Sequence, residues 1–438
     1  MQVNIPVRIS IAGALLFLCF SGCGDDEPVA PNPPGEPAIQ SVSPQSGSIG
    51  AIVIITGSNF SPVATLDTVL FNGRRAVVDS ASHIRIVTMV PESTTSGPIL
   101  LIIRQDTILG GNFTITQPAW IATGSMANAR FGHSSTALAN GTVLVAGGNT
   151  GTCELFSPST NSWTPAASMS RERTFHSATL LRDGRVLVAG GLSDNPRSCE
   201  LYNPQSDTWT ITGILNFERE YHSATLLGNG RVIVTGGVSG TGFLPFCEIY
   251  DPNSGTWSVV DSMSVGRAFH AVFLLSTNNV LVVSGETSVC ELFNAASGQW
   301  SSTASLPTSR AFGAGATIRG GDIVFTGGAE ASAPSSNTNR YSINGGSWTL
   351  AGEMGVPRIN HEAVTLPTHG TILVCGGDSN GKLSSSCEVY GRTGQWIETS
   401  SMSTRRAFHR ATALPSGAIL VSGGQTPTPA YSCEIYLP

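Results

Sequence analysis

Short apolar runs, each closed by a turn signal, dominate the chain from about residue 37 onward. In the first part of the chain, residues 53–55 end at Gly57, residues 69–71 end at the turn Asn72-Gly73, and residues 99–103 form a third run. Runs of this length with Gly or Asn punctuation are typical of β-strands rather than helices. They predict a small all-β domain, a β-sandwich, over residues 37–116.

From residue 117 to 438 the apolar runs recur with a period of roughly 42–49 residues, which is typical of propeller blades of four strands. Most repeats contain a two-residue turn such as Asn140-Gly141, an apolar strand that ends in Gly-Gly, and a Cys-Glu-apolar-aromatic segment followed by a Trp. Seven such repeats fit this span, so the sequence predicts a seven-bladed β-propeller.

Each repeat also carries an Arg, and in most repeats a His follows it three residues later. The Arg residues are Arg130, Arg173, Arg219, Arg267, Arg310, Arg358 and Arg406, and the His residues are His133, His176, His222, His270, His361 and His409. The Glu residues of the Cys-Glu segment are Glu154, Glu200, Glu248, Glu291, Glu388 and Glu434. The fifth repeat has Gly313 and Asn339 in the His and Glu positions. This joint loss predicts that each His pairs with a Glu of its own or a neighbouring blade, by a charge-assisted bond. Arg310 persists without the Glu, so we expect the Arg not to depend on it.

The two ends of the repeat region predict how the propeller closes. The last repeat stops at Leu437-Pro438 without its Trp, and an extra Trp120 stands before the first Arg. The segment around Trp120 is therefore expected to be the outermost strand of the last blade, which removes an open sheet edge.

Both regions resemble known families. The motifs Ile39-x-x-Val42-x-Pro44 and Val53-x-Ile55-x-Gly57-x-Asn59-Phe60 resemble the IPT/TIG immunoglobulin-like domains, which implies a spacer or binding module. The order of strand, Gly-Gly, aromatic and Trp resembles kelch repeats. The Arg-x-x-His and Glu-Leu-Tyr motifs are similar to those of bacterial kelch proteins and of the central propeller of galactose oxidase.

The galactose oxidase resemblance implies a copper enzyme with tyrosine ligands and a His from a domain after the propeller. The chain ends with the propeller, so that domain is expected to be absent, and its copper residues cannot be mapped here. Equivalent residues on successive blades should lie ~10 Å or more apart, given strands ~4.8 Å apart. Zinc ligands need ~2.0–2.3 Å. We therefore expect no metal and no cofactor.

The first residues are typical of an export signal. Arg8 precedes an apolar run over residues 9–20, and Ser21 and Gly22 precede Cys23. This resembles the lipobox of bacterial lipoproteins, which implies a signal peptide over 1–22 and lipidation of Cys23; cleavage by an ordinary signal peptidase is the alternative. Residues 23–36 form a Pro-rich tether. The expected location is the bacterial cell envelope, lipid-anchored, with the outer membrane favoured because Gly24 rather than Asp follows Cys23.

Composition narrows the functions. The net charge is −6 and only 12% of residues are charged, which excludes the basic footprint of a nucleic-acid binder. Lys382 is the single Lys, and no phosphate-binding loop precedes it. Of the 9 Cys, Cys375 could face Cys387 on the adjacent strand, bonded or free. The other repeated Cys are too far apart for disulfides.

The predicted function is a non-catalytic binding module at the envelope that presents the propeller to a carbohydrate or protein ligand. The alternatives are a carbohydrate-active enzyme (an epimerase, lyase or oxidase-like protein) with its site at the channel mouth, or a structural partner in an envelope complex. The repeated Arg either bond carbonyls of an adjoining blade or face an anionic or sugar ligand at the mouth. Loops 238–246 (with Phe243), 329–337, 378–386 and 425–432 are candidate contact surfaces. Glu286, in place of the second Gly of the fourth repeat, is the candidate non-repeated acid.

Overall fold

The computed structural model describes residues 35–427 and 430–438. The predicted signal peptide, the lipidation at Cys23 and nearly all of the tether lie outside the described residues. Within the described part of the chain, no helix is long and apolar enough to cross a membrane. The described chain is built almost entirely of strands, with one short 3-10 helix at Ala64–Leu66.

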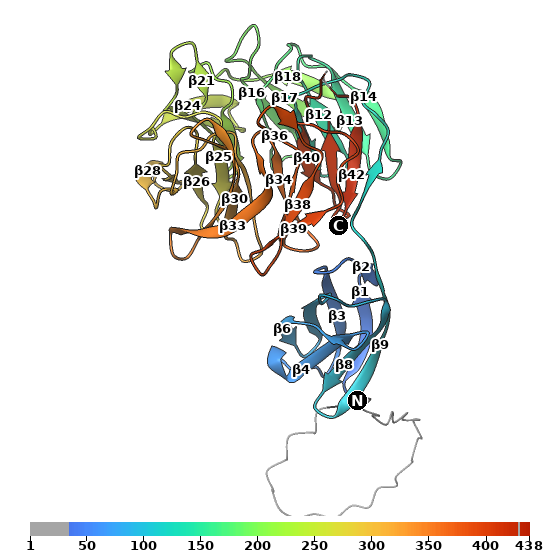
Figure 1. Ribbon diagram of the computed structural model, residues 1–438. Coiled ribbons are helices and arrows are strands. Elements are labelled where there is room, and N and C mark those ends of the chain that lie inside the picture. Colours follow the sequence, from blue (N-terminus) through green and yellow to red (C-terminus); the bar gives the residue numbers. More distant parts are fainter. Residues whose placement is uncertain (1–34, 428–429) are drawn as a thin grey trace, which may run out of the picture.

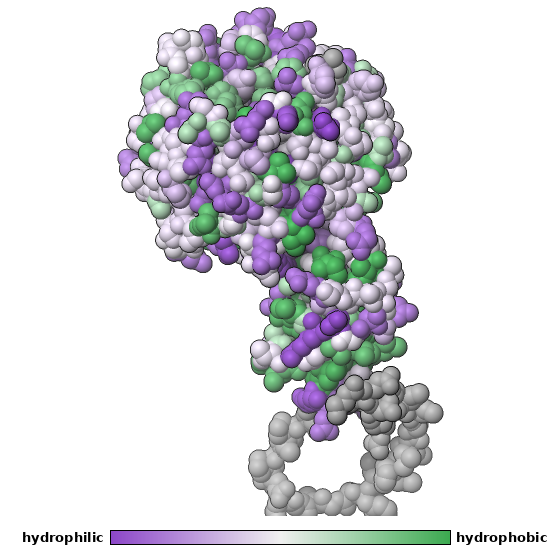
Figure 2. Space-filling view, in the orientation of Figure 1, coloured by the Kyte–Doolittle hydropathy of each residue, from purple (hydrophilic) through white to green (hydrophobic). Residues whose placement is uncertain are grey.

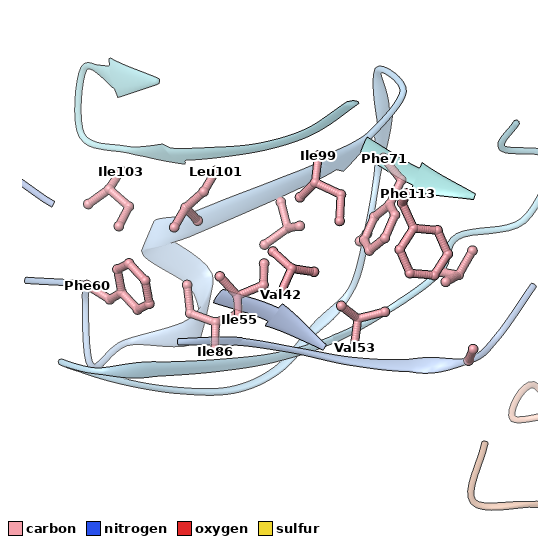
Figure 3. Close-up of a cluster of buried hydrophobic side chains, with 14 residues drawn as sticks. Val42, Val53, Ile55, Phe60, Phe71, Ile86, Ile99, Leu101, Ile103 and Phe113 are labelled. Atoms are coloured by element: carbon pink, nitrogen blue, oxygen red, sulfur yellow. The ribbon is translucent and has the colours of Figure 1, made fainter. Parts of the chain in front are cut away.

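Two sheets form the N-terminal domain, as predicted. One sheet holds, in spatial order, β1 (Ala38–Ser43), β3 (Ile52–Ser58), β7 (Arg85–Met89) and β6 (Val78–Ser82). The other holds β2 (Ser46–Gly47), β9 (Asp106–Ile115), β8 (Gly97–Ile103), β4 (Asp67–Phe71) and β5 (Arg74–Arg75). Alternate residues of β3, β4 and β8 are buried, because one face of each strand packs on the opposite sheet. Figure 3 shows these side chains meeting between the sheets. The rings of Phe71 and Phe113 meet edge to face, with their centroids 5.2 Å apart.

Seven sheets follow within the described residues, six with four strands and one with five because β31 joins it, and we number them as blades in chain order. Blades one to three are β11 (Ser134–Ala137), β12 (Val143–Ala146), β13 (Cys153–Ser157), β14 (Ser162–Ala166); β15 (Ser177–Leu180), β16 (Val186–Ala189), β17 (Cys199–Asn203), β18 (Thr208–Ile211); and β19 (Ser223–Leu226), β20 (Val232–Thr235), β23 (Cys247–Asp251), β24 (Thr256–Val260). Blades four to six are β25 (Ala271–Leu274), β26 (Asn279–Val283), β27 (Glu291–Asn294), β28 (Gln299–Ser302); β29 (Ala314–Thr317), β30 (Ile323–Thr326), β32 (Ala333–Ser342), β33 (Ser347–Arg358); and β34 (Glu362–Leu366), β35 (Thr371–Cys375), β38 (Cys387–Tyr390), β39 (Trp396–Thr399). Blade seven is β40 (Arg410–Ala413), β41 (Ile419–Ser422), β42 (Cys433–Leu437) and β10 (Ala119–Ala122). Short antiparallel strand pairs lie in the loops that join second to third strands: β21 (Val238–Ser239) with β22 (Gly242–Phe243), β31 (Ala329–Glu330) with β32, and β36 (Asp378–Ser379) with β37 (Lys382–Leu383).

The two ends of the chain close the propeller as the position of Trp120 predicts. Strand β10 pairs with β42, and Trp120 lies opposite Tyr436 with their ring centroids 5.2 Å apart. The other blades repeat this aromatic pair, for example Tyr250 with Trp257 at 5.1 Å. The innermost strands adjoin one another in a closed cycle in which β11 contacts both β15 and β40. The second strand of each blade is buried on both faces, which explains its unbroken apolar sequence.

The N-terminal domain docks on one face of the propeller. Asp79 accepts from Arg319 at 2.6 Å and from Arg392 at 3.1 Å, and Ser48 Oγ lies 2.9 Å from His369 Nε2. These partners lie in hairpins that join first to second or third to fourth strands, so we call this side the lower face. The loops that join second to third strands, including the β21–β22 hairpin, lie on the upper face, away from the N-terminal domain (Figure 1). In Figure 2, hydrophobic residues gather on the visible side of the N-terminal domain, whereas the propeller surface is mixed.

Candidate binding site at the channel mouth

The repeated Arg residues lie inside the blades. All seven are 0–1% exposed. In blade three, Arg219 donates from Nη1 to the carbonyls of Gly236 and Phe246 and from Nη2 to Glu248 Oε1 at 2.8 Å. Glu248 also accepts the backbone N–H of Asn216 at 2.7 Å. The same ion pair recurs as Arg130–Glu154, Arg173–Glu200, Arg267–Glu291, Arg358–Glu388 and Arg406–Glu434.

These pairs correct three predictions. The Glu partner of each blade is its Arg and not its His, and the carbonyls that the Arg contacts belong to its own blade rather than an adjoining one. These guanidinium groups are 0–1% exposed, so no ligand can reach them, even though the Nε–H of Arg219 has no partner among the described residues. The hypothesis that Arg130, Arg173, Arg219, Arg267, Arg310, Arg358 and Arg406 face a ligand is therefore wrong.

The repeated His residues link neighbouring blades. Each places Nε2 against a hydroxyl or thiol of the preceding blade: His133 on Ser422, His176 on Ser134, His222 on Ser177, His270 on Thr235, His361 on Thr326 and His409 on Cys375. Burial lowers the pKa of these imidazoles, to about 3 for His270 and His361. Neutral His in this position is a structural link between blades.

Blade five explains why the sequence comparison misled. Gly313 leaves room for Phe325, since a Cβ at Gly313 would lie 2.5 Å from Phe325 Cζ. The Phe325 ring in turn lies 5.0 Å below the Arg310 guanidinium carbon, and Asn339 accepts a hydrogen bond from Arg310 Nη2. His and Glu are lost together because one larger side chain fills the His space and offers the Arg a cation–π contact in place of a carboxylate.

A ring of seven residues surrounds the upper mouth of the central channel, one from the position just before each repeated His or, in blade five, before Gly313. They are Gly132, Phe175, Tyr221, Phe269, Phe312, Asn360 and Phe408, and all have a left-handed backbone with φ between 52° and 60°. The backbone N–H of each donates to the carbonyl of the ring residue on the preceding blade, at 2.8–3.3 Å, so the seven bonds close a circle. We call these residues the mouth ring. The sequence analysis missed it, although an aromatic precedes the His position in five repeats.

Aromatic side chains of the mouth ring contact one another. Phe175 stacks on Tyr221 with centroids 4.1 Å apart, and Phe269 lies 4.2 Å from Phe312. Phe243, a predicted contact residue, is 40% exposed on the β21–β22 hairpin and meets Phe269 edge to face at 6.4 Å. The ring and this hairpin form one continuous aromatic surface on the upper face.

A cavity of about 440 Å³ lies at the mouth ring and between the inner strands. Glu362 and Arg410 line it and form an ion pair at 2.8 Å between blades six and seven. Burial raises the pKa of the Glu362 carboxyl, and Arg410 opposes that shift. The sequence analysis missed this pair. The signal was a charged residue directly after the His position in blades six and seven, where the other five blades have Ser or Ala.

Glu286 lies outside this cavity, and its predicted register is wrong. Ser284 and Gly285 are the structural counterparts of the Gly pair: both have positive φ, and Arg267 Nη1 donates to the Ser284 carbonyl at 3.0 Å. Glu286 follows them as an exposed loop residue. In the neighbouring 238–246 loop, Leu244 is buried, and Phe246 stacks on Phe217 at 4.4 Å.

The thiols are structural. Cys375 lies opposite Cys387 on the paired strands β35 and β38, as predicted, but both are free, like the other Cys of the described residues. Burial raises the pKa of these thiols, to about 12 for Cys387.

An immunoglobulin-like domain followed by a kelch-type propeller is the class of protein that this architecture defines. The IPT/TIG domain profile matches residues 37–118, and the Kelch motif profile matches residues 221–264. A search of curated proteins finds no match.

Among solved structures, the chain is similar to a protein described as a novel fungal alcohol oxidase with catalytic diversity among the AA5 family, in complex with copper. The TM-score is 0.61 at 18% identity, over 73% of this chain and 76% of that one, which establishes a shared fold.

Because that neighbour holds copper, we asked whether the side chains of this chain could bind the metal. The described residues contain no group of three or more His, Cys, Asp or Glu that could hold a metal ion. The Nε2 atom of His222 is occupied by Ser177, and that of His270 by Thr235. The described residues do not fit a copper centre of this kind.

Proposed function

We propose that this chain is a non-catalytic binding module, held at the bacterial envelope by lipid on Cys23, that presents the upper mouth of its propeller to a carbohydrate or protein ligand. One observation carries the proposal: five bulky aromatic residues hold a left-handed backbone in the mouth ring. Each such residue costs roughly 1–2 kcal/mol. Gly132 and Asn360 occupy the same position, and these residue types adopt that backbone at little cost. The fold therefore accepts residues with less backbone strain at this position, and the presence of five strained aromatic residues there points to a role in binding.

The layout of the chain supports the same proposal. The IPT/TIG domain is fixed to the lower face through Asp79, Arg319 and Arg392. The tether precedes that domain, so a lipid at its start would place the membrane on the side of the N-terminal domain. The mouth ring and Phe243, on the upper face, would then point away from the membrane, where a ligand can reach them.

The test is a glycan array and a pull-down from intact membranes, both with the full chain and with Tyr221→Gly and Phe269→Gly. We expect these variants to lose binding while stability changes by only about 1 kcal/mol, because relief of backbone strain offsets the lost contact area. Ile211→Ser, a 77% exposed position on the outermost strand of blade two, is the control that should bind normally. Unchanged binding by both ring variants would refute the proposal.

A carbohydrate-active enzyme is the second candidate, and Glu362 favours it. This carboxyl has a raised pKa in the cavity, which suits a general acid. It is, however, the one carboxylate among the described residues that line the cavity, whereas glycoside hydrolysis ordinarily uses a pair. Turnover of a glycan that Glu362→Gln abolishes would replace the binding proposal with this one.

A further inference from the structure

We infer that the cavity at the mouth ring binds the end of a neutral saccharide, with Glu362 and Arg410 as its polar anchor. This inference rests on the proposed binding function and assigns it a ligand class and a site. Three features of the cavity carry it: the free atoms of the ion pair, the aromatic wall across from the pair, and the absence of a repeated equivalent.

The ion pair leaves one donor and one acceptor side by side. Glu362 Oε1 accepts from Arg410 Nη1, and Arg410 Nε donates to the carbonyl of His133 at 2.9 Å. Among the described residues, none bonds Glu362 Oε2 or Arg410 Nη2. The two side chains are 20% and 41% exposed, and both line the cavity. A hydroxyl can donate to the carboxylate oxygen while its neighbour accepts from the guanidinium, which matches adjacent hydroxyls of a sugar.

Charge favours a neutral ligand. The carboxylate and guanidinium compensate each other at 2.8 Å, so the anchor offers no net charge to a phosphate, carboxylate or ammonium group. Glu362 is the one acidic side chain and Arg410 the one Arg or Lys among the described residues that line the cavity.

The wall across the channel is apolar and aromatic. Tyr221 of blade three and Phe269 of blade four line the cavity on the far side from blade seven. An aromatic face packs against the C–H face of a pyranose ring, because the face carries partial negative charge. A polar anchor and an aromatic wall in a cavity of about 440 Å³ fit a small ligand with one polar edge and one apolar face.

The fold does not require this pair. The five other blades have Ser or Ala at the position of Glu362 and Arg410, and their inner strands form without charge. A half-buried ion pair contributes little to stability by itself. Its presence in two adjoining blades is therefore better explained by a ligand than by folding.

The test is calorimetric titration of the full chain with cellobiose, chitobiose, lactose and maltotriose, and with glucuronic acid as the acidic comparison. We expect one neutral sugar to bind and Glu362→Gln to weaken its Kd by about 10- to 100-fold, the loss expected for a hydrogen bond to a charged group. Glu286→Gln is the matched control on an exposed carboxylate, and its Kd should not change. Phe269→Leu, which keeps an apolar side chain but removes the aromatic face, should weaken binding independently of the ion pair. Thermal unfolding verifies that each variant is folded.

The outcomes separate the two claims. Binding of a neutral sugar with an unchanged Kd in Glu362→Gln would overturn this site and leave the proposed function standing. Binding of glucuronic acid alone would overturn the neutral class. If no sugar binds but the membrane pull-down captures a protein that the mouth-ring variants lose, the saccharide assignment fails and the binding function survives. If neither sugar nor protein binds, both fail.

Discussion

The buried Arg–Glu pair of blade three provides a sharp test of how the blades are held together. Glu248→Gln removes the charge but keeps the shape of the side chain. Arg219 and Glu248 have 0% exposed side chains, and the carboxylate also accepts from the backbone N–H groups of Asn216 and Phe217. The variant leaves a charged guanidinium buried without its counter-ion, which costs about 3–5 kcal/mol. The new amide N–H₂ also faces at least one N–H donor.

Equilibrium unfolding of the full chain in guanidinium chloride, followed by Trp fluorescence, measures this loss. Glu218→Gln changes an exposed carboxylate in the same connection and should stay within about 0.5 kcal/mol of the parent. A loss below about 1 kcal/mol for Glu248→Gln would refute the conclusion that the ion pair fixes the blade.

Blade five supplies a second arm of the same test. Its Gly313, Phe325 and Asn339 replace the His, Val and Glu of the other blades. In blade three the equivalent changes are His222→Gly, Val234→Phe and Glu248→Asn. We expect the triple variant to lose less stability than Glu248→Asn alone, because the Phe ring restores a partner for the Arg. Simple additivity of the three losses would contradict the coupling inferred from blade five.

Three further predictions follow from the described contacts and the sequence. Burial lowers the pKa of His270 and His361 to about 3, so the stability that these neutral His residues contribute is complete above pH 6.5 and is lost as the pH falls toward 3, at about 1.4 kcal/mol per pH unit for each His. The midpoints of guanidinium unfolding between pH 7.5 and 4.5 measure this loss, and midpoints that do not change with pH would contradict it. Trp120→Ala should cost about 3 kcal/mol and lower the Tm, because the indole lies 5.2 Å from Tyr436 and donates to the Ser400 carbonyl at 2.8 Å; an unchanged Tm would show that strand β10 does not hold the propeller closed. Cys23→Ser should move the chain from the membrane to the soluble fraction and abolish labelling with radioactive palmitate, whereas retention in the membrane would argue against the lipid anchor.

The fold was readable from the sequence because its signals repeat. Gly-Gly, the strand-three aromatic and the Trp recur at one spacing, and Trp120 was informative because it was the copy out of place. Such features report backbone geometry and packing, which are local to a repeat. The pairing partner of Arg219 was not readable in the same way, because Glu248 lies 29 residues downstream and its position shows only once the blade is formed.

The candidate site was harder to predict for a related reason. An aromatic residue gives no sign of a left-handed backbone, so the mouth ring could not be inferred from Phe175 or Tyr221. The Glu362–Arg410 pair spans two blades and differs from the repeat, so alignment on shared features passes over it. Glu286 drew attention only because the Gly pair of blade four was aligned one residue too late. Repetition reveals the scaffold, whereas a binding site lies in the departures from it.

The circle of backbone hydrogen bonds in the mouth ring has a consequence for how such a protein can change. Its seven bonds join main-chain atoms only, so the width of the mouth does not depend on which side chains stand there. The ring already holds residues as different as Gly132, Asn360 and Phe408. Each position can therefore be exchanged singly without disturbing its neighbours' backbone, whereas the buried Arg–Glu pairs beneath it cannot. The propeller thus separates a repeated frame from a set of replaceable positions, and ligand preference can change one blade at a time.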